Sequence, residues 1–214
     1  MLRLFTNQIF FRMEPGLVST PSSTEGLWEY LLIIRPDAHV CSKLNAEKQE
    51  FSDRYHSAAI QLKPHITIGA FLAPERVENT IIKWVERICS MQKSFPVVLN
   101  NYSGYPEHTI FLRVQNPEPF QELAFQLNVI DNFIRANNCP PLKLVSRPHL
   151  SIAAKLPAEV YSKAMPEYSR KLFHEVFMAT ELLLLKRLNQ FDACRHVNVF
   201  RFYPPDTNSY NQVA

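Results

Sequence analysis

Two short stretches of the sequence repeat the same order of residue types, and each holds a histidine followed two positions later by a hydroxyl side chain. The first stretch, KPHITIGAFL, runs from Lys63 to Leu72, and the second, RPHLSIAAKL, runs from Arg147 to Leu156. A single H-x-T pattern is a weak signal, but folding gives no reason to keep both histidines and both hydroxyls. The repeat therefore predicts one site formed by four side chains: His65, Thr67, His149 and Ser151.

Two imidazoles that face each other suit a reaction in which one proton is removed and another is delivered. Histidine has an unperturbed pKa near neutrality, so one ring can be neutral while the other is charged. The hydroxyls can donate hydrogen bonds to an anion, and Lys63 and Arg147, two residues before the histidines, can add positive charge. A phosphodiester fits these groups, because its cleavage needs a base, an acid and donors to the non-bridging oxygens.

Both stretches read as strands, in which successive side chains point to opposite faces. One face of each strand is expected to be apolar and to pack under helices. The other face is expected to carry His65, Thr67, Gly69 and Phe71 in the first copy and His149, Ser151, Ala153 and Lys155 in the second. This places Phe71 where it can stack on a base, although packing in the core is the favoured interpretation. Lys155 can meet a phosphate or stay solvated, and Tyr105, in the turn before the second repeat, is predicted to line the mouth of the site.

Other catalytic and cofactor motifs are absent from the sequence. It has no H-E-x-x-H, G-x-S-x-G, P-loop or G-x-G-x-x-G pattern, and its 4 glycines cannot build a glycine-rich phosphate loop. No carboxylate accompanies either histidine in the two stretches, which argues against a two-metal phosphatase. We therefore expect no metal and no other cofactor. A metal site made by the facing histidines is the alternative, although two ligands are fewer than a zinc site uses.

The composition is that of an ordinary folded protein. Apolar residues make up 46% and charged residues 20% of the 214 residues, and a net charge of +3 implies no strong attraction for polyanions. No apolar run approaches the length of a membrane span, and the first residues lack the features of a signal peptide. The cysteines form no C-x-x-C pair, which indicates free thiols in a reducing compartment. The sequence predicts a cytoplasmic protein without membrane contact.

The order of the expected elements also repeats. Residues 1–27 read as an N-terminal extension and linker, and residues 204–214 as a C-terminal tail. Strands are expected at 28–35, 65–72, 95–106, 108–115, 149–156, 181–187 and 196–204, and helices at 38–55, 74–88, 118–134 and 158–172. Asp37 is expected to cap the first helix, and Pro166 to kink or split the last. The prediction is an α+β fold that is internally duplicated, with two similar sheet-plus-helices lobes, roughly 28–106 and 107–203, forming a central cleft.

Two H-φ-[ST]-φ motifs, in which φ is apolar, each on a central strand of a duplicated lobe, resemble the two-histidine phosphoesterase superfamily. The chain is most similar to its bacterial 2'-5' RNA ligase and cyclic phosphodiesterase branch, over residues 28–203 as a single bilobal domain. The resemblance implies that His65 and Thr67 lie on one wall of the cleft and His149 and Ser151 on the other. It also implies metal-independent opening of 2',3'-cyclic phosphates, or making and breaking of 2'-5' phosphodiesters, on RNA ends or small nucleotides.

The weak positive charge favours a short substrate at least as much as a long RNA, because RNA binding draws on several phosphate contacts. The expected partner is therefore a nucleotide or an RNA end, and the expected state is a monomer. The alternative is a module that binds a nucleotide or an RNA end in the same cleft without turnover. Binding needs the hydrogen-bond donors but not two titratable groups, so the sequence favours the enzyme.

Overall fold

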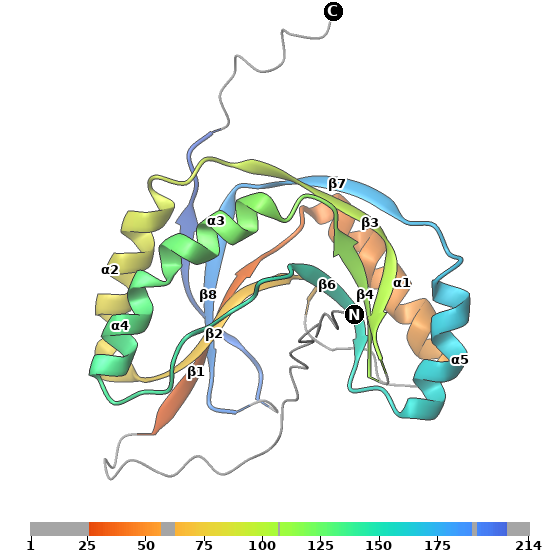
Figure 1. Ribbon diagram of the computed structural model, residues 1–214, viewed down its shortest axis with the longest axis horizontal. Coiled ribbons are helices and arrows are strands. Elements are labelled where there is room, and N and C mark those ends of the chain that lie inside the picture. The colour runs from red at the N-terminus through yellow and green to blue at the C-terminus, as the bar shows by residue number, and fades with distance from the viewer. Residues whose placement is uncertain (1–25, 57–62, 107, 190–191, 205–214) are drawn as a thin grey trace, which may run out of the picture.

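The structure, a computed structural model, describes residues 26–56, 63–106, 108–189 and 192–204 (Figure 1). Within these ranges the chain forms a nine-stranded antiparallel sheet. The strands are β1 (Leu27–Ile34), β2 (Ile66–Pro74), β3 (Phe95–Tyr105), β4 (Thr109–Val114), β5 (Lys143–Leu144), β6 (His149–Ala154), β7 (His174–Ala179), β8 (Glu181–Arg187) and β9 (Arg195–Arg201). Almost all of the predicted N-terminal extension and C-terminal tail lies outside the described residues.

The sheet has two halves that meet at the strands of the repeated stretches. Its strand order is β7-β3-β4-β6-β2-β1-β8-β9, and β5 pairs with β2. A single residue pair, Ile66 with Leu150, joins β2 to β6. The two predicted lobes are therefore parts of one continuous sheet rather than two separate sheets. Each half also takes strands from both parts of the chain, because β3 lies between β4 and β7 and β8 lies beside β1. The predicted boundary between residues 106 and 107 thus does not divide the sheet.

The described ranges contain the helices α1 (Ala38–Tyr55), α2 (Glu78–Cys89), α3 (Glu118–Leu127), α4 (Val129–Ala136) and α5 (Ala158–Tyr168), and a 3-10 turn η1 (Glu75–Val77). α1 packs against β6 and β7 and α5 against β3 and β4, whereas α2 contacts β9 and α3 contacts β2. Figure 1 shows α2, α3 and α4 at one side of the molecule and α5 at the other. None of these helices is long and apolar enough to cross a membrane.

Local sequence explains where several helices begin and end. The side chain of Asp37 accepts a hydrogen bond of 2.9 Å from the backbone N–H of Val40, which confirms the predicted cap of α1. The helix expected at 118–134 is divided at Asn128 into α3 and α4. Pro166 does not split α5, because it lies in the last turn of that helix. The sequence analysis did not predict β5 or β7.

The two faces of the sheet bury different clusters of side chains. Alternate residues of β1 belong to the large core that the strands form with the helices: Tyr30, Leu32 and Ile34. Between them, Leu31 and Ile33 belong to a small separate cluster with two leucines of β8. Ile33 is the cross-strand partner of Thr67, so the face with the small cluster also carries the hydroxyl of the first repeat. We call it the histidine face and the opposite one the helix face.

A β-bulge interrupts the alternation of β2 just after Thr67. Thr67 pairs with Ile33 and Gly69 pairs with Leu32, so Ile68 is an extra residue between the two pairs. Because Leu32 lies in the large core, its partner Gly69 is on the helix face. The predicted alternation is therefore wrong beyond Thr67.

The strand β6 has a bulge at the same place in its motif. Ser151 pairs with Phe111 and Ala153 pairs with Ile110, which leaves Ile152 as the extra residue. Both Ile152 and Ala153 are fully buried in the large core. The predicted alternation is wrong here too, beyond Ser151.

Candidate functional site

The pairing of β2 with β6 brings the four predicted catalytic residues together. The single residue pair that joins these strands is Ile66 with Leu150. His65 directly precedes Ile66, and His149 directly precedes Leu150. Continuing this antiparallel register by one residue in each direction sets His65 beside Ser151 and Thr67 beside His149. The two residues of the joining pair are fully buried on the helix face, so their neighbours in each strand point to the histidine face.

The backbone that precedes each histidine holds the ring in the same way. Nδ1 of His65 lies 2.8 Å from the carbonyl oxygen of Lys63, and Nδ1 of His149 lies 3.0 Å from that of Arg147. Because a carbonyl oxygen can only accept, Nδ1 carries the hydrogen in both rings, and Nε2 keeps the lone pair of the neutral imidazole. The Lys63 and Arg147 side chains, predicted to add charge, are exposed. In the structure, Lys63 and Arg147 contribute to the site through their backbone carbonyl oxygens, which accept the Nδ1 hydrogen bonds of the histidines.

Burial lowers the pKa of both imidazoles below the ordinary value of 6.5, and the backbone hydrogen bonds oppose this only in part. The positive charges of Lys48 and Arg35, and that of His149 when it is protonated, lower the pKa of His65 further. The influence of His149 on His65 also means that the two rings lie within electrostatic reach of each other. At pH 7 both rings are mainly neutral in the free protein, as a general base must be.

Two aromatic rings pack against the second histidine, and none among the described residues is found against the first. The ring centroids of Phe111 and His149 are 4.8 Å apart, and those of Tyr105 and His149 are 5.3 Å apart. The structure thus places Tyr105 against His149. It adds Phe111, the cross-strand partner of Ser151, which the sequence analysis did not include. The partner of Thr67 is instead aliphatic, so the two halves of the site differ in character.

Two predicted binding residues lie elsewhere because of the bulges. Phe71 is 3% exposed and stacks on Tyr30 of the large core, with ring centroids 5.0 Å apart. The prediction that Phe71 can stack on a base is therefore wrong, and the favoured interpretation, core packing, is correct. Lys155 follows the end of β6, is exposed, and has a left-handed backbone with φ 57°. Alternation along β6 therefore does not carry Lys155 onto the histidine face.

Two arginines that the motifs do not contain lie next to the histidines. Arg113 of β4 is the cross-strand partner of His149. Arg35 directly follows β1, and the last pair of β1 with β2 is Ile34 with Ile66. Continuing this antiparallel register by one residue sets Arg35 opposite His65. A signal for both was present in the sequence. Each repeated stretch is preceded by an expected strand with two apolar residues and then an arginine, I-I-R at 33–35 and F-L-R at 111–113.

Other potential ligands are dispersed over the fold. Across the part of the chain that the structure describes, no three His, Cys, Asp or Glu side chains gather in a group that could hold a metal ion. The four cysteines are free thiols, as predicted: Cys41, Cys89, Cys139 and Cys194.

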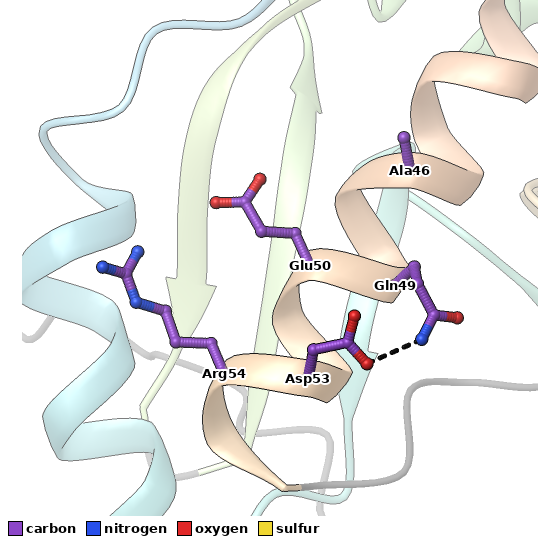
Figure 2. A pocket seen from close by; sticks show the side chains of 5 residues that line it. All are labelled: Ala46, Gln49, Glu50, Asp53 and Arg54. Atoms are coloured by element: carbon purple, nitrogen blue, oxygen red, sulfur yellow. Dashed lines mark hydrogen bonds between the residues drawn. The ribbon is translucent and has the colours of Figure 1, made fainter.

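A shallow depression on α1 is a poor match for a phosphate. It is lined by Ala46, Gln49, Glu50, Asp53 and Arg54 (Figure 2). Nε2 of Gln49 donates a hydrogen bond of 2.7 Å to Asp53, and the guanidinium of Arg54 is paired with Glu167 of α5. The two carboxylates that line this depression would repel an anion. The arrangement on the histidine face is the better candidate site.

Comparison with known proteins assigns the chain to a family. Residues 40–190, well over half of the chain, match the family model described as the 2'-5' RNA ligase superfamily. The chain belongs to this superfamily. The result confirms the resemblance to two-histidine phosphoesterases that the motifs indicated. A search of curated proteins gives no match.

Solved structures show the same fold at low sequence identity. E. coli LigT complexed with 3'-AMP is similar, with a TM-score of 0.64 and 12% identity over 82% of this chain and 98% of that chain. The protein TT0787 of Thermus thermophilus has a TM-score of 0.60 and 17% identity, also over 82% and 98%. A further structure, named only as a phosphoesterase, has a TM-score of 0.62 and 12% identity over the same shares. Family and fold together support a phosphoesterase-like or RNA ligase-like activity for this member of the superfamily.

Proposed function

We propose that this superfamily member is a metal-independent phosphodiesterase that acts on 2',3'-cyclic phosphates or 2'-5' phosphodiesters of RNA ends or small nucleotides. The matched orientation of the two imidazoles carries the proposal. Each ring donates its Nδ1–H to a carbonyl two residues earlier, which leaves the lone pair of the neutral ring on Nε2 for proton transfer. A site that only binds an anion has no need of two titratable rings fixed in this way.

In the proposed hydrolysis one neutral imidazole removes a proton from water as the water oxygen forms a bond to phosphorus. The other imidazole, protonated, gives its proton to the ribose oxygen whose bond to phosphorus breaks. The hydroxyls of Thr67 and Ser151 donate to the non-bridging oxygens, on which negative charge grows. Both rings are mainly neutral in the free protein, but a bound phosphate raises the pKa of a neighbouring imidazole. One ring therefore takes up the acid's proton after the substrate binds.

We also infer that the domain, residues 28–203, arose by internal duplication and that its two sheet halves form the walls of a substrate cleft on the histidine face. Three matched features support the duplication. Both repeated strands have a bulge after the hydroxyl residue, both histidines bond to the carbonyl two residues earlier, and both have an arginine in or directly after the neighbouring strand. The single pair between β2 and β6 supports the cleft, because the two halves of the sheet are joined there over only a short length.

The proposed substrate is a nucleotide or a short RNA end. A net charge of +3 gives little long-range attraction for a long RNA. LigT, which has the same fold, has been crystallised with 3'-AMP, with phosphate, with ATP and with NADP+. All four catalytic side chains come from one chain, so we propose that the monomer is active.

Single replacement of each histidine tests the proposal directly. His65→Ala and His149→Ala are each expected to reduce turnover of 2',3'-cyclic AMP or of a 2'-5' dinucleotide by roughly 10²–10⁴-fold, the usual contribution of a general acid or base. His174→Ala, at an exposed position at the start of β7, is the control and should keep the wild-type rate. Turnover should persist in EDTA and follow a bell-shaped dependence on pH.

Three results would contradict the mechanism. Near-wild-type turnover by either single variant would exclude the paired roles of the histidines. Loss of turnover in EDTA with recovery on addition of a divalent cation would point to the metal alternative. Tight binding of the nucleotides by the wild-type protein without any turnover would identify a binding module instead.

A further inference from the structure

Arg35 lies at the edge of the proposed active site, next to His65. It is two residues after Ile33, whose side chain is on the histidine face. The last pair of β1 with β2 is Ile34 with Ile66, and continuing that register by one residue sets Arg35 opposite His65. Cross-strand neighbours of this kind have Cα atoms about 4.5–5.5 Å apart. The charge of Arg35 acts on His65 and on Cys194, which packs against the small cluster of the histidine face. The charge of Arg35 also acts on Cys41 of α1, so the placement of the guanidinium on the histidine face rests on the continued register of β1 with β2.

The guanidinium of Arg35 has a hydrogen-bond donor that no described residue satisfies. Its Nε is buried and lacks an acceptor within the described ranges. No ion pair identified among the described residues includes Arg35. A buried donor without a partner is unfavourable, and a charged one more so. An anion bound beside His65 would satisfy this donor.

The matched arginine on β4 is in a different situation. Nε of Arg113 donates to the carbonyl oxygen of Asn100 at 3.4 Å, and the Arg113 side chain is exposed. The His65 end of the site also has Lys48, a residue of α1 that is 7% exposed and whose charge reaches His65. The His149 end has aromatic rings instead. Arg35 and Lys48 both act on His65, whereas no cationic side chain of the described residues is found to shift the pKa of His149.

We propose that Arg35 is a phosphate-binding residue of the histidine site and that its guanidinium donates to phosphoryl oxygens of the substrate beside His65. The planar guanidinium can donate two parallel hydrogen bonds to a phosphate, which lysine cannot do with fixed geometry. This role supplements the hydroxyls of Thr67 and Ser151 and fixes the end of the site at which the phosphate is held. The proposal rests on the proposed function for its effect on turnover, but not for its effect on phosphate binding.

The test compares Arg35→Gln, Arg35→Lys and the control Arg87→Gln, which changes an exposed arginine of α2. The Kd of inorganic phosphate is measured by calorimetry, and kcat/KM is measured with 2',3'-cyclic AMP. A hydrogen bond to a charged group contributes about 1.5–3 kcal/mol, which corresponds to roughly 10- to 100-fold in affinity. Arg35→Gln is therefore expected to weaken phosphate binding and to lower kcat/KM by roughly 10- to 100-fold. Arg35→Lys should recover part of both, and Arg87→Gln should change neither.

The imidazole pKa of His65, followed by NMR, separates this role from a merely structural one. Arg35→Gln removes one positive charge and should raise that pKa, whereas Arg35→Lys keeps the charge and should leave the pKa lowered. Lys48 and His149 are unchanged in both variants, so the difference reports on Arg35 alone. Wild-type phosphate affinity in Arg35→Gln would overturn the proposal. If that variant does not fold, Arg35→Lys decides instead, and wild-type activity and phosphate affinity in Arg35→Lys would show that no guanidinium is needed. If the wild-type protein shows no turnover but Arg35→Gln still loses phosphate, the proposed function fails and the assignment of Arg35 stands.

Discussion

Thr67 and Ile66 are neighbours in β2, and the structure places their side chains on opposite faces of the sheet. Thr67 lies on the histidine face, where its hydroxyl is proposed to donate to a phosphate oxygen, whereas Ile66 is fully buried in the large core. Thr67→Val keeps the shape of the side chain and removes the donor, so turnover is expected to fall by roughly 10²-fold or more. Its melting temperature should stay close to that of the wild type.

Ile66→Ala is the matched control for this prediction. It empties a core position and should cost about 2–5 kcal/mol of the free energy of unfolding. Turnover per folded molecule should hardly change. Thermal melting and single-substrate kinetics on both variants check the pair, and an early-melting but active Thr67→Val would show that the faces of β2 have been exchanged.

At the scale of the element, the bulges decide which side chains reach the site. The bulge at Ile68 turns Phe71 into the core, where it stacks on Tyr30. Phe71→Ala is therefore expected to lower the free energy of unfolding by about 3–5 kcal/mol, as for other buried aromatic residues. The KM for 2',3'-cyclic AMP should remain at the wild-type value at a temperature where the variant is folded. Chemical denaturation and kinetics measure the two quantities, and a raised KM in a normally stable variant would mean that Phe71 stacks on the substrate.

The position of the histidines, the hydroxyls and the first strands could be predicted from the sequence, because each depends on local pattern. The bulges could not be predicted, because a bulge is defined by how a strand pairs with its neighbour and the pattern of a single strand does not indicate it. The small residues Gly69 and Ala153 gave a partial signal. A Cβ atom on Gly69 would lie 3.0 Å from the Leu144 side chain of β5, so the helix face has little room there.

At the scale of the whole molecule, the arrangement of the sheet escaped prediction for a similar reason. The repeat of element types indicated two lobes in chain order, but β8 pairs with β1 and β3 pairs with β4 and β7. Pairing between distant strands depends on three-dimensional packing that a linear pattern does not specify. The arginines illustrate the consequence, because only the register of neighbouring strands places Arg35 and Arg113 beside the histidines.

The burial of the two histidines, which the proposed proton transfer uses, also affects the stability of the whole fold. Burial lowers the pKa of His65 and His149 in the folded protein below the ordinary value of 6.5 that applies to the unfolded chain. Between the folded and unfolded pKa values, the unfolded chain therefore binds more protons than the folded one. The stability associated with the two rings is fully present above about pH 6.5. It is lost progressively as the pH falls through their folded pKa values.

Replacing both rings with a side chain that does not titrate isolates this effect. The double variant His65→Gln/His149→Gln is expected to lose less free energy of unfolding than the wild type when the pH falls from about 6.5 to about 5, because each unit of pKa shift corresponds to about 1.4 kcal/mol. His174→Gln, which changes an exposed ring, should follow the wild-type curve. Urea denaturation at a series of pH values gives the comparison. Identical pH dependence in the wild type and the double variant would mean that the two imidazoles are not held neutral by burial, and the proposed uptake of a proton after substrate binding would lose its basis.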